Sequence, residues 1–232
     1  MLSRMFKLLT LIISLAVTIL ACRLTASPPT PTTRPTRAPV PTPTFNIVVP
    51  PRPVFPSPNG REMGDANAPV TVEIFSDFQC PACRQFATSV EPQIVQQYVT
   101  SGQVHLIYRH YPFLGDESML AARASMCAAD QNLFWDYHDV LFANWDGENQ
   151  GAFKQEKLLA FANALGVEMG AFSACVDAKS YQSVIDQDLK LGKSKGVTGV
   201  PSVFVNDQVV SPGYIPGHKD MQNAIDAALG KP

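Results

Sequence analysis

The sequence lacks the features that mark several common classes of protein. Its formal net charge is only −2, so its composition does not indicate a surface that binds nucleic acid. Its four histidines stand singly, and it contains one Cys-x-x-Cys pair rather than two. Tetrahedral zinc needs four ligands, so we expect no metal site and no other cofactor.

The sequence also lacks an N-terminal apolar run long enough to span a bilayer. Arg4 and Lys7 precede the apolar run Leu8–Leu20, which is shorter than the ~20 residues of a spanning helix. This pattern predicts a signal peptide over residues 1–22. The letters ILAC that end it resemble a bacterial lipobox, which implies cleavage before Cys22 and a lipid on that residue. The alternatives are an uncleaved signal anchor and cleavage further along that discards Cys22. Each of them places the remaining chain outside the cytoplasm, where disulfides persist.

Proline is unevenly distributed. Twelve of the 20 prolines fall between Pro28 and Pro58, in a segment with few large apolar side chains. Such a segment cannot bury enough surface to offset its ordering entropy, so residues 23–59 are predicted to be an extended, disordered tether. Within it, only Phe45–Val49 could pair as a short edge strand. Residues 60–232 are then the folded domain, which begins with the turn-rich stretch Gly60–Pro69.

The stretch Val70–Cys83 carries the chemistry of that domain. Its letters are VTVEIFSDFQCPAC, an apolar β-branched run followed by two cysteines at the predicted start of a helix. Cys80 would face the unpaired N–H groups and the positive end of the helix dipole. Both favour the thiolate, so its pKa should lie below the ~8.5 of a free cysteine. Half of a zinc site and an inert structural disulfide are the alternatives, and redox chemistry is the interpretation we favour.

The rest of the chain predicts a helical segment inserted into an α/β domain. Helical spacing after Cys83, a kink at Pro92 and the strand Val104–Tyr108 indicate a parallel β-α-β unit. A strand near Gly196–Val205 then precedes a hairpin turn and a final helix at Met221–Leu229. Between these parts the helical pattern predicts five helices, near Glu117–Gln131, Leu133–Trp145, Lys154–Leu165, Gly170–Val176 and Ser180–Lys195. The aromatic residues of the second helix are interpreted as core: Phe134, Trp135, Tyr137, Phe142 and Trp145.

Three stretches in this order resemble the DsbA-like class of thioredoxin-fold proteins: APVTVEIFSDFQCPACRQF, CAADQNLFWDYHDVLF and GVTGVPSVFVND. The resemblance implies a thioredoxin fold with an inserted all-helical subdomain at about residues 113–195. It also implies a cis peptide bond between Val200 and Pro201, beside the redox pair and in the substrate groove. Glu73 stands near the position of a buried acid that relays protons in the family. A solvent-facing strand glutamate is the alternative.

Two further cysteines, Cys127 and Cys175, remain after Cys22, Cys80 and Cys83 are assigned. Both fall in the helical insert, and an oxidising compartment favours a structural disulfide between them, which would contribute about 2–4 kcal/mol. The alternative is a pair of buried free thiols that pack as small hydrophobes.

The resemblance implies an extracytoplasmic thiol:disulfide oxidoreductase that donates the Cys80–Cys83 disulfide to exported proteins. It further implies reoxidation by a quinone-linked membrane partner, of the DsbB-like or vitamin K epoxide reductase-like type. We expect a lipid-anchored monomer on the outer face of a bacterial membrane. One alternative is a membrane-tethered reductase or isomerase of the same fold, and another is a non-catalytic peptide-binding or chaperone module.

Overall fold

The computed structural model describes residues 45–51, 59–210 and 214–231. The predicted signal peptide, Cys22 and most of the predicted tether lie outside these residues. The described part contains a five-stranded mixed sheet of order β1-β3-β2-β4-β5. The strands are β1 (Glu62–Met63), β2 (Val70–Ser76), β3 (Val104–His110), β4 (Ser202–Val205) and β5 (Gln208–Val209).

The central strand β2 pairs in parallel with β3, from Val70 opposite Val104 to Ser76 opposite His110. The two strands are connected by α2 (Pro81–Ser89), α3 (Glu91–Ile94) and the π-helical turn η1 (Val95–Val99). The parallel β-α-β unit predicted from the sequence is therefore confirmed. On its other edge β2 pairs antiparallel with β4, which forms a hairpin with β5. Asn206 and Asp207 form the turn with positive φ values of 44° and 65°, as tight hairpin turns require.

The kink predicted at Pro92 is present as a break between two helices. Helix α2 ends at Ser89, and Pro92 lies in the first turn of α3. A proline in the first turn lacks an N–H group that would have had no intrahelical partner. The break therefore costs few backbone hydrogen bonds and lets the chain turn along the sheet.

The predicted helical insert is present, with boundaries that differ from the predicted ones by a few residues. Its helices are α4 (Asp116–Ala129), α5 (Phe134–Ala143), α6 (Gln155–Ala164), α7 (Met169–Asp177) and α8 (Gln182–Ser194), and α9 (His218–Ala228) follows the hairpin. The predicted aromatic cluster is part of the core: four of its members are buried and Trp145 is half-buried. Cys127 on α4 and Cys175 on α7 form a disulfide with an S–S distance of 1.98 Å.

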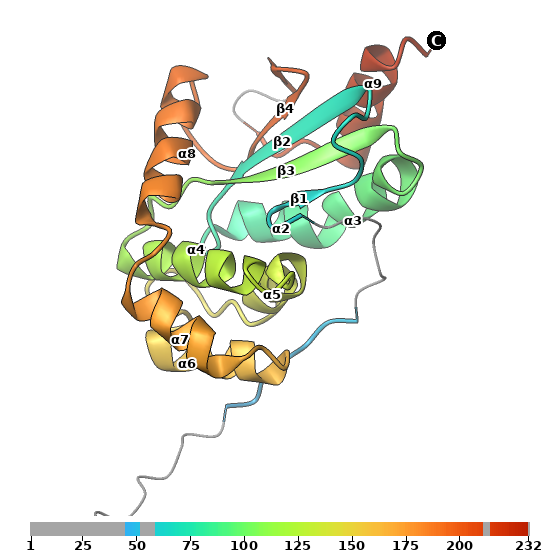
Figure 1. The fold of residues 1–232 in the computed structure, drawn as a ribbon. Helices are drawn as coiled ribbons and strands as arrows, with labels where there is room; N and C mark the ends of the chain where they lie inside the picture. The colour runs from blue at the N-terminus through green and yellow to red at the C-terminus, as the bar shows by residue number, and fades with distance from the viewer. Residues whose placement is uncertain (1–44, 52–58, 211–213, 232) are drawn as a thin grey trace, which may run out of the picture. The chain divides into compact units, whose positions relative to one another are not determined.

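The two faces of the sheet carry different layers. Val72 and Ile74 of β2 belong to a large core with α2, α3, α9 and the helices α4 to α7. Phe75 belongs to a smaller cluster with Tyr111, Val197 and Phe204, packed against leucines of α8. Figure 1 shows the central strands between α8 and α2. Helices α4 and α5 lie next to α2, and α6 and α7 lie beyond α4 and α5. We call the face with α2 the redox face and the face with α8 the ionic face.

Two expectations about the N-terminal part of the domain are wrong. Phe45–Val49 does not form a strand, because Val48 bonds a side chain instead: Asn144 Oδ1 accepts from Val48 N at 2.9 Å and Asn144 Nδ2 donates to Val48 O at 2.7 Å. The stretch Gly60–Pro69 contains a strand that we did not predict, β1, which pairs antiparallel with the edge of β3. Among the described helices, none is long and apolar enough to cross a membrane.

Candidate active site

Strand β2 leads directly to the two cysteines of the Cys-x-x-Cys motif. Cys80 is the N-cap residue of α2, with φ −76° and ψ 122°, and Pro81 follows at the first helical position. Cys83 lies one turn further on and is 1% exposed, whereas Cys80 is 7% exposed. Both are free thiols. A side chain at the N-cap can accept hydrogen bonds from the first backbone N–H groups of the helix, so Cys80 occupies the place where a thiolate is stabilised.

The surroundings of the two thiols shift their pKa values in opposite directions. The pKa of Cys80 is lowered from 9.0 to about 7, first by a hydrogen bond from the Cys83 side chain and also by the backbone N–H groups of Cys83 and Ala82. Burial and the charge of Asp77 oppose this shift. The pKa of Cys83 is raised well above 9.0, chiefly by burial and also by Cys80. At neutral pH Cys80 can therefore be a thiolate while Cys83 keeps its proton.

The loop before β4 lies beside Cys80. The Val200–Pro201 peptide bond is cis, and Cys80 Sγ lies 3.5 Å from the carbonyl oxygen of Val200. A hollow of about 360 Å³ adjoins this loop, lined by Ala82, residues 198–202, Tyr214 and Ile215. Tyr214 at its rim is 60% exposed. The hollow next to the thiol is wide enough to receive a side chain of a peptide.

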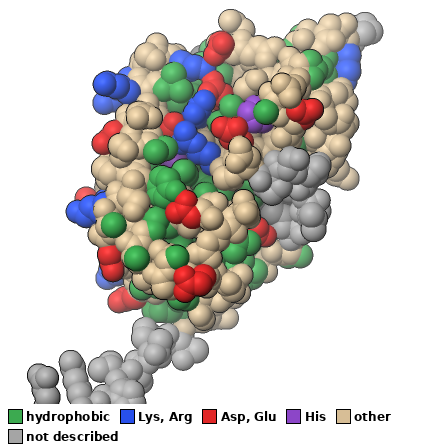
Figure 2. Space-filling model, viewed as in Figure 1, with side chains coloured by type: hydrophobic (Ala, Val, Ile, Leu, Met, Phe, Trp, Pro, Cys, Tyr) green, Lys and Arg blue, Asp and Glu red, His purple; other side chains and the backbone are tan. Residues whose placement is uncertain are grey.

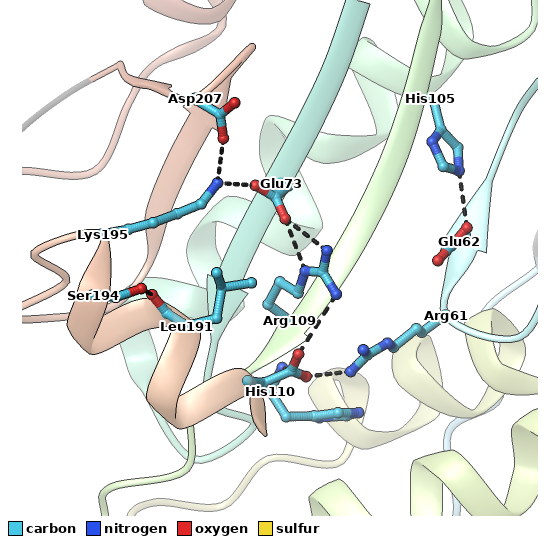
Figure 3. A network of polar contacts seen from close by, with 11 residues as sticks. Arg61, Glu62, Glu73, His105, Arg109, His110, Leu191, Ser194, Lys195 and Asp207 are labelled. Atoms are coloured by element: carbon cyan, nitrogen blue, oxygen red, sulfur yellow. Dashed lines mark hydrogen bonds and ion pairs between the residues drawn. The ribbon is translucent and has the colours of Figure 1, made fainter. Parts of the chain in front are cut away.

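Glu73 does not lie where the proton-relay hypothesis needs it. It alternates with Val72 and Ile74 along β2, so it points to the ionic face, away from Cys83. Its carboxylate accepts from Arg109 Nε at 2.9 Å and pairs with Lys195. Figure 3 shows Glu73 between Arg109 and Lys195. At 7% exposure Glu73 is a buried acid, as the resemblance implies, so the solvent-facing alternative is wrong, whereas its place on the ionic face does not support the proton-relay role.

The acid next to the redox pair is Asp77, which the sequence analysis did not single out. Asp77 is 1% exposed, and its backbone N–H donates to Cys83 Sγ at 3.5 Å. Its carboxylate accepts from three backbone N–H groups, those of Gln79 (2.9 Å), Phe113 (2.9 Å) and Leu114 (3.2 Å). Only two residues separate Asp77 from Cys80, and they belong to the turn that connects β2 to α2. This short spacing is the signal from which the position of Asp77 beside the redox pair could have been predicted.

Among the described residues, the ligand atoms of Glu91, His138 and Asp139 come within 4.8 Å of one another. The ring of His138 is fully buried and packs against Phe142, with 4.9 Å between ring centroids. Glu91 is buried and Asp139 is partly exposed; His138 Nδ1 lies 2.9 Å from Asp139 Oδ1 and His138 Nε2 lies 3.7 Å from Glu91 Oε2.

A cysteine pair at the start of a helix, fed by the central strand and faced by a cis-proline loop, defines the thioredoxin class of redox proteins. The family model described as thioredoxin matches residues 57–227, and the chain belongs to that family. It is 29% identical over 175 residues to a probable disulfide bond formation protein D of Bacillus cereus, covering 74% of this chain and 79% of the relative.

Solved structures agree with this assignment. Oxidised BdbD from Bacillus subtilis has a TM-score of 0.68 and 26% identity, covering 76% of this chain and 96% of that one. A thioredoxin-like oxidoreductase from Silicibacter pomeroyi has a TM-score of 0.63 and 28% identity, covering 76% and 95%. With the geometry above, these similarities identify the chain as an extracytoplasmic thiol:disulfide oxidoreductase with a DsbA-like thioredoxin fold.

Proposed function

We propose that this protein donates a disulfide between Cys80 and Cys83 to exported proteins as they fold. The observation that supports the proposal is the contrast between the two thiols: the pKa of Cys80 is lowered to about 7, and that of Cys83 is raised well above 9.0. A thiol of low pKa leaves easily, and stabilising the reduced pair makes the disulfide a stronger oxidant.

The reaction has two exchange steps. A substrate thiolate attacks Cys80 Sγ, the bond to Cys83 breaks, and Cys83 leaves as a thiolate that takes up a proton because burial raises its pKa. A second substrate thiolate then attacks the substrate sulfur of the mixed disulfide and expels Cys80. The substrate is oxidised by two electrons, and the cysteine pair is reduced to one thiolate and one thiol at neutral pH.

The hollow beside the cis-proline loop is the proposed substrate groove. Val200 and Pro201 line it together with Ala82, directly next to Cys80. A peptide lying there would bring its cysteine to the exposed side of Cys80, whereas Cys83 is 1% exposed and out of reach. The groove therefore directs the first attack to Cys80.

Each turnover leaves the pair reduced, so a partner must remove two electrons. We infer a quinone-linked membrane protein of the DsbB-like or vitamin K epoxide reductase-like type. A lipid on Cys22 and a tether over residues 23–59 would hold the domain, as a monomer, close to that partner on the outer face of a bacterial membrane. The disulfide between Cys127 and Cys175 has a structural role in this proposal.

The test is the equilibrium reduction potential of Cys80 and Cys83, titrated with glutathione in the chain without residues 1–22. A value between about −120 and −180 mV, the range of DsbA and protein disulfide isomerase, supports donation of disulfides. A value near about −270 mV, as in thioredoxin, would contradict it and favour a reductase kept reduced by a membrane donor.

A further inference from the structure

Gln79, the residue directly before Cys80, has a fully buried side chain whose polar atoms are all bonded. It is 0% exposed. Its Nε2 donates to the carbonyl oxygen of Leu114 at 3.1 Å and to Ser118 Oγ at 2.9 Å. Its Oε1 accepts from the backbone N–H of Asn149 at 2.6 Å. The amide thus joins the turn before α2 to two parts of the helical insert, the start of α4 and the loop after α5.

The backbone of Gln79 is also held on both sides. Its N–H donates to Asp77 Oδ1 at 2.9 Å, and its carbonyl oxygen accepts from Trp145 Nε1 at 2.7 Å. Trp145 belongs to the same loop of the insert as Asn149. Because the Gln79 carbonyl belongs to the peptide unit that leads into Cys80, these bonds fix the orientation in which Cys80 enters the helix.

That orientation matters because Cys80 is the N-cap. A side chain at the N-cap accepts from the N–H groups two and three residues further on only when the backbone holds it in a non-helical conformation. Cys80 has this conformation and forms no side-chain cap hydrogen bond in the structure, but the N–H groups of Cys83 and Ala82 are near enough to lower its pKa. A turn that could rotate before Cys80 would weaken these contacts with the thiolate without unfolding the helix.

We propose that Gln79 is a positioning residue, through which the insert loop that carries Trp145 and Asn149 holds Cys80 at the helix N-terminus and thereby sets how strongly the cysteine pair oxidises. The proposal rests on the redox role proposed above for Cys80. It assigns to the helical insert a function beyond covering the sheet, which is to determine the redox properties of a motif that lies outside it.

The side chain at position 79 must both donate and accept. A glutamate of the same length could not donate to the Leu114 carbonyl, and an asparagine would be one methylene shorter. The loop that carries Asn149 can approach the start of α4 only because residue 115 is a glycine. Gly115 has a φ of +103°, and an added Cβ there would lie 2.7 Å from Asn149 Oδ1. Asn149 Nδ2 also donates to Leu114 O at 2.7 Å, so the loop and the turn share one carbonyl.

The experiment compares three variants of the chain without residues 1–22. Gln79→Met removes the side-chain hydrogen bonds and keeps the length. Trp145→Phe removes the indole donor and also replaces the larger ring over which Arg84 lies at 5.7 Å. Gln182→Met is the matched control, because Gln182 is also a glutamine with a hydrogen-bonded side chain. It is half-buried, lies on α8, and its Oε1 accepts from Arg123 Nη1 at 3.0 Å. For each we would measure the equilibrium with glutathione and the thiolate absorbance of Cys80 near 240 nm against pH.

We expect Gln79→Met to shift the glutathione equilibrium, measured at pH 9 where Cys80 is ionised in both chains, about tenfold towards the disulfide, which is about 30 mV more negative. Its thiolate titration should move up by about one pH unit. Trp145→Phe should move both quantities in the same direction by less, and Gln182→Met should leave both unchanged while lowering the melting temperature.

The proposal is overturned if Gln79→Met keeps the potential and titration of the parent chain within twofold and only melts earlier, as a structural residue would. A shift towards a stronger oxidant also overturns it. If Gln79→Met does not fold, Trp145→Phe decides alone by the same criteria. The outcome is independent of the test of the proposed function, because it depends on differences between variants rather than on the absolute potential.

Discussion

The two faces of the sheet hold their buried polar groups in different ways. On the redox face the side-chain contacts of Gln79 join neutral groups, an amide with a hydroxyl and backbone groups, and its carbonyl accepts from an indole; the one carboxylate that Gln79 contacts is that of Asp77, which accepts from its backbone N–H. On the ionic face the contacts are between charges, and Lys195 and Arg109 both pair with Glu73 while Arg109 and Arg61 pair with Asp188. Figure 2 shows such basic and acidic side chains side by side between α8 and the sheet.

The difference follows from what each face supports. A charge near Cys80 changes its pKa, as Asp77 does by raising it. Hydrogen bonds between neutral groups, such as those of Gln79 and Trp145, can fix the position of the Cys80 thiol without placing a further charge beside it. The ionic face has no thiol to protect, and there the charges join α8 to β2 and β3. We therefore expect substitutions on the redox face to change the chemistry and substitutions on the ionic face to change stability.

The largest effect should come from Cys80→Ser on the redox face. Without the sulfur that accepts the substrate thiolate, oxidation of a reduced model substrate should fall to the uncatalysed rate. The measurement is the recovery of activity by reduced RNase A with the variant as the only disulfide donor. Cys83→Ser is the informative counterpart and is mixed with scrambled, disulfide-containing RNase A: its Cys80 thiolate attacks a substrate disulfide, one substrate sulfur leaves as a thiolate, and the mixed disulfide accumulates because Cys83 is not there to resolve it. Mass spectrometry detects this adduct. Catalysis retained by Cys80→Ser would disprove the assignment.

On the ionic face, Asp188→Ala should lower the free energy of unfolding by about 3–5 kcal/mol. The substitution leaves the largely buried guanidinium of Arg61 without the carboxylate with which it pairs. The Asp188 side chain is 3% exposed, pairs with Arg61 and accepts from the backbone N–H of His110 at 3.0 Å. Urea denaturation measures the loss. The reduction potential should stay that of the parent chain.

The matched control is Asp186→Ala, an exposed carboxylate on the same helix, for which we expect a change within about 0.5 kcal/mol. An equal loss in both variants would mean that the ion pairs do not stabilise this face. A changed potential in Asp188→Ala would break the separation between the two faces.

The sequence predicted the redox motif and the helical insert well because both depend on local pattern. A strand, two cysteines and a proline at a helix start are contiguous, and the helices of the insert follow the periodicity of their own residues. Cys127 and Cys175 could be paired by elimination, since few cysteines remained once the others had been assigned.

The failures concern contacts between distant segments. The face to which Glu73 points depends on the register of β2, and a shift of one residue reverses it. Gln79 is bonded to Asn149, which is 70 residues away, and no local pattern marks that contact. The strand β1 has two residues and exists because β3 offers it an edge. Val48 pairs with the side chain of Asn144 rather than with a strand, a partner that strand propensity does not reveal.

Removal of the disulfide in the insert tests a third region, away from both faces of the sheet. The double variant Cys127→Ala with Cys175→Ala should lose about 2–4 kcal/mol of unfolding free energy, because the bond restricts the unfolded chain. Guanidinium denaturation under oxidising conditions measures the loss, and the glutathione equilibrium of Cys80 and Cys83 should not change. A loss of exchange activity with unaltered stability would contradict the structural role.

The smallest effect concerns the reduced protein and pH. Because the pKa of Cys80 is about 7 in the folded state and about 9.0 as a free group, the unfolded state binds more protons between these values. Stability of the reduced form should therefore rise with pH across this window, by at most about 1.4 kcal/mol per pH unit, and this gain should be absent below pH 7. The buried Cys83 acts in the opposite sense above about pH 9, where its unfolded thiol ionises and its folded thiol does not.

The oxidised protein is the internal control for this prediction, because neither sulfur titrates in a disulfide. Urea midpoints of the reduced and oxidised forms should diverge between pH 7 and 9, and the difference isolates the two cysteines from all other groups. In Trp145→Phe the divergence should shrink, since a less firmly held Cys80 gains less from the helix N-terminus. Parallel pH profiles of the two forms would show that Cys80 is not a stabilised thiolate, and the contrast between the two faces would then lack its chemical basis.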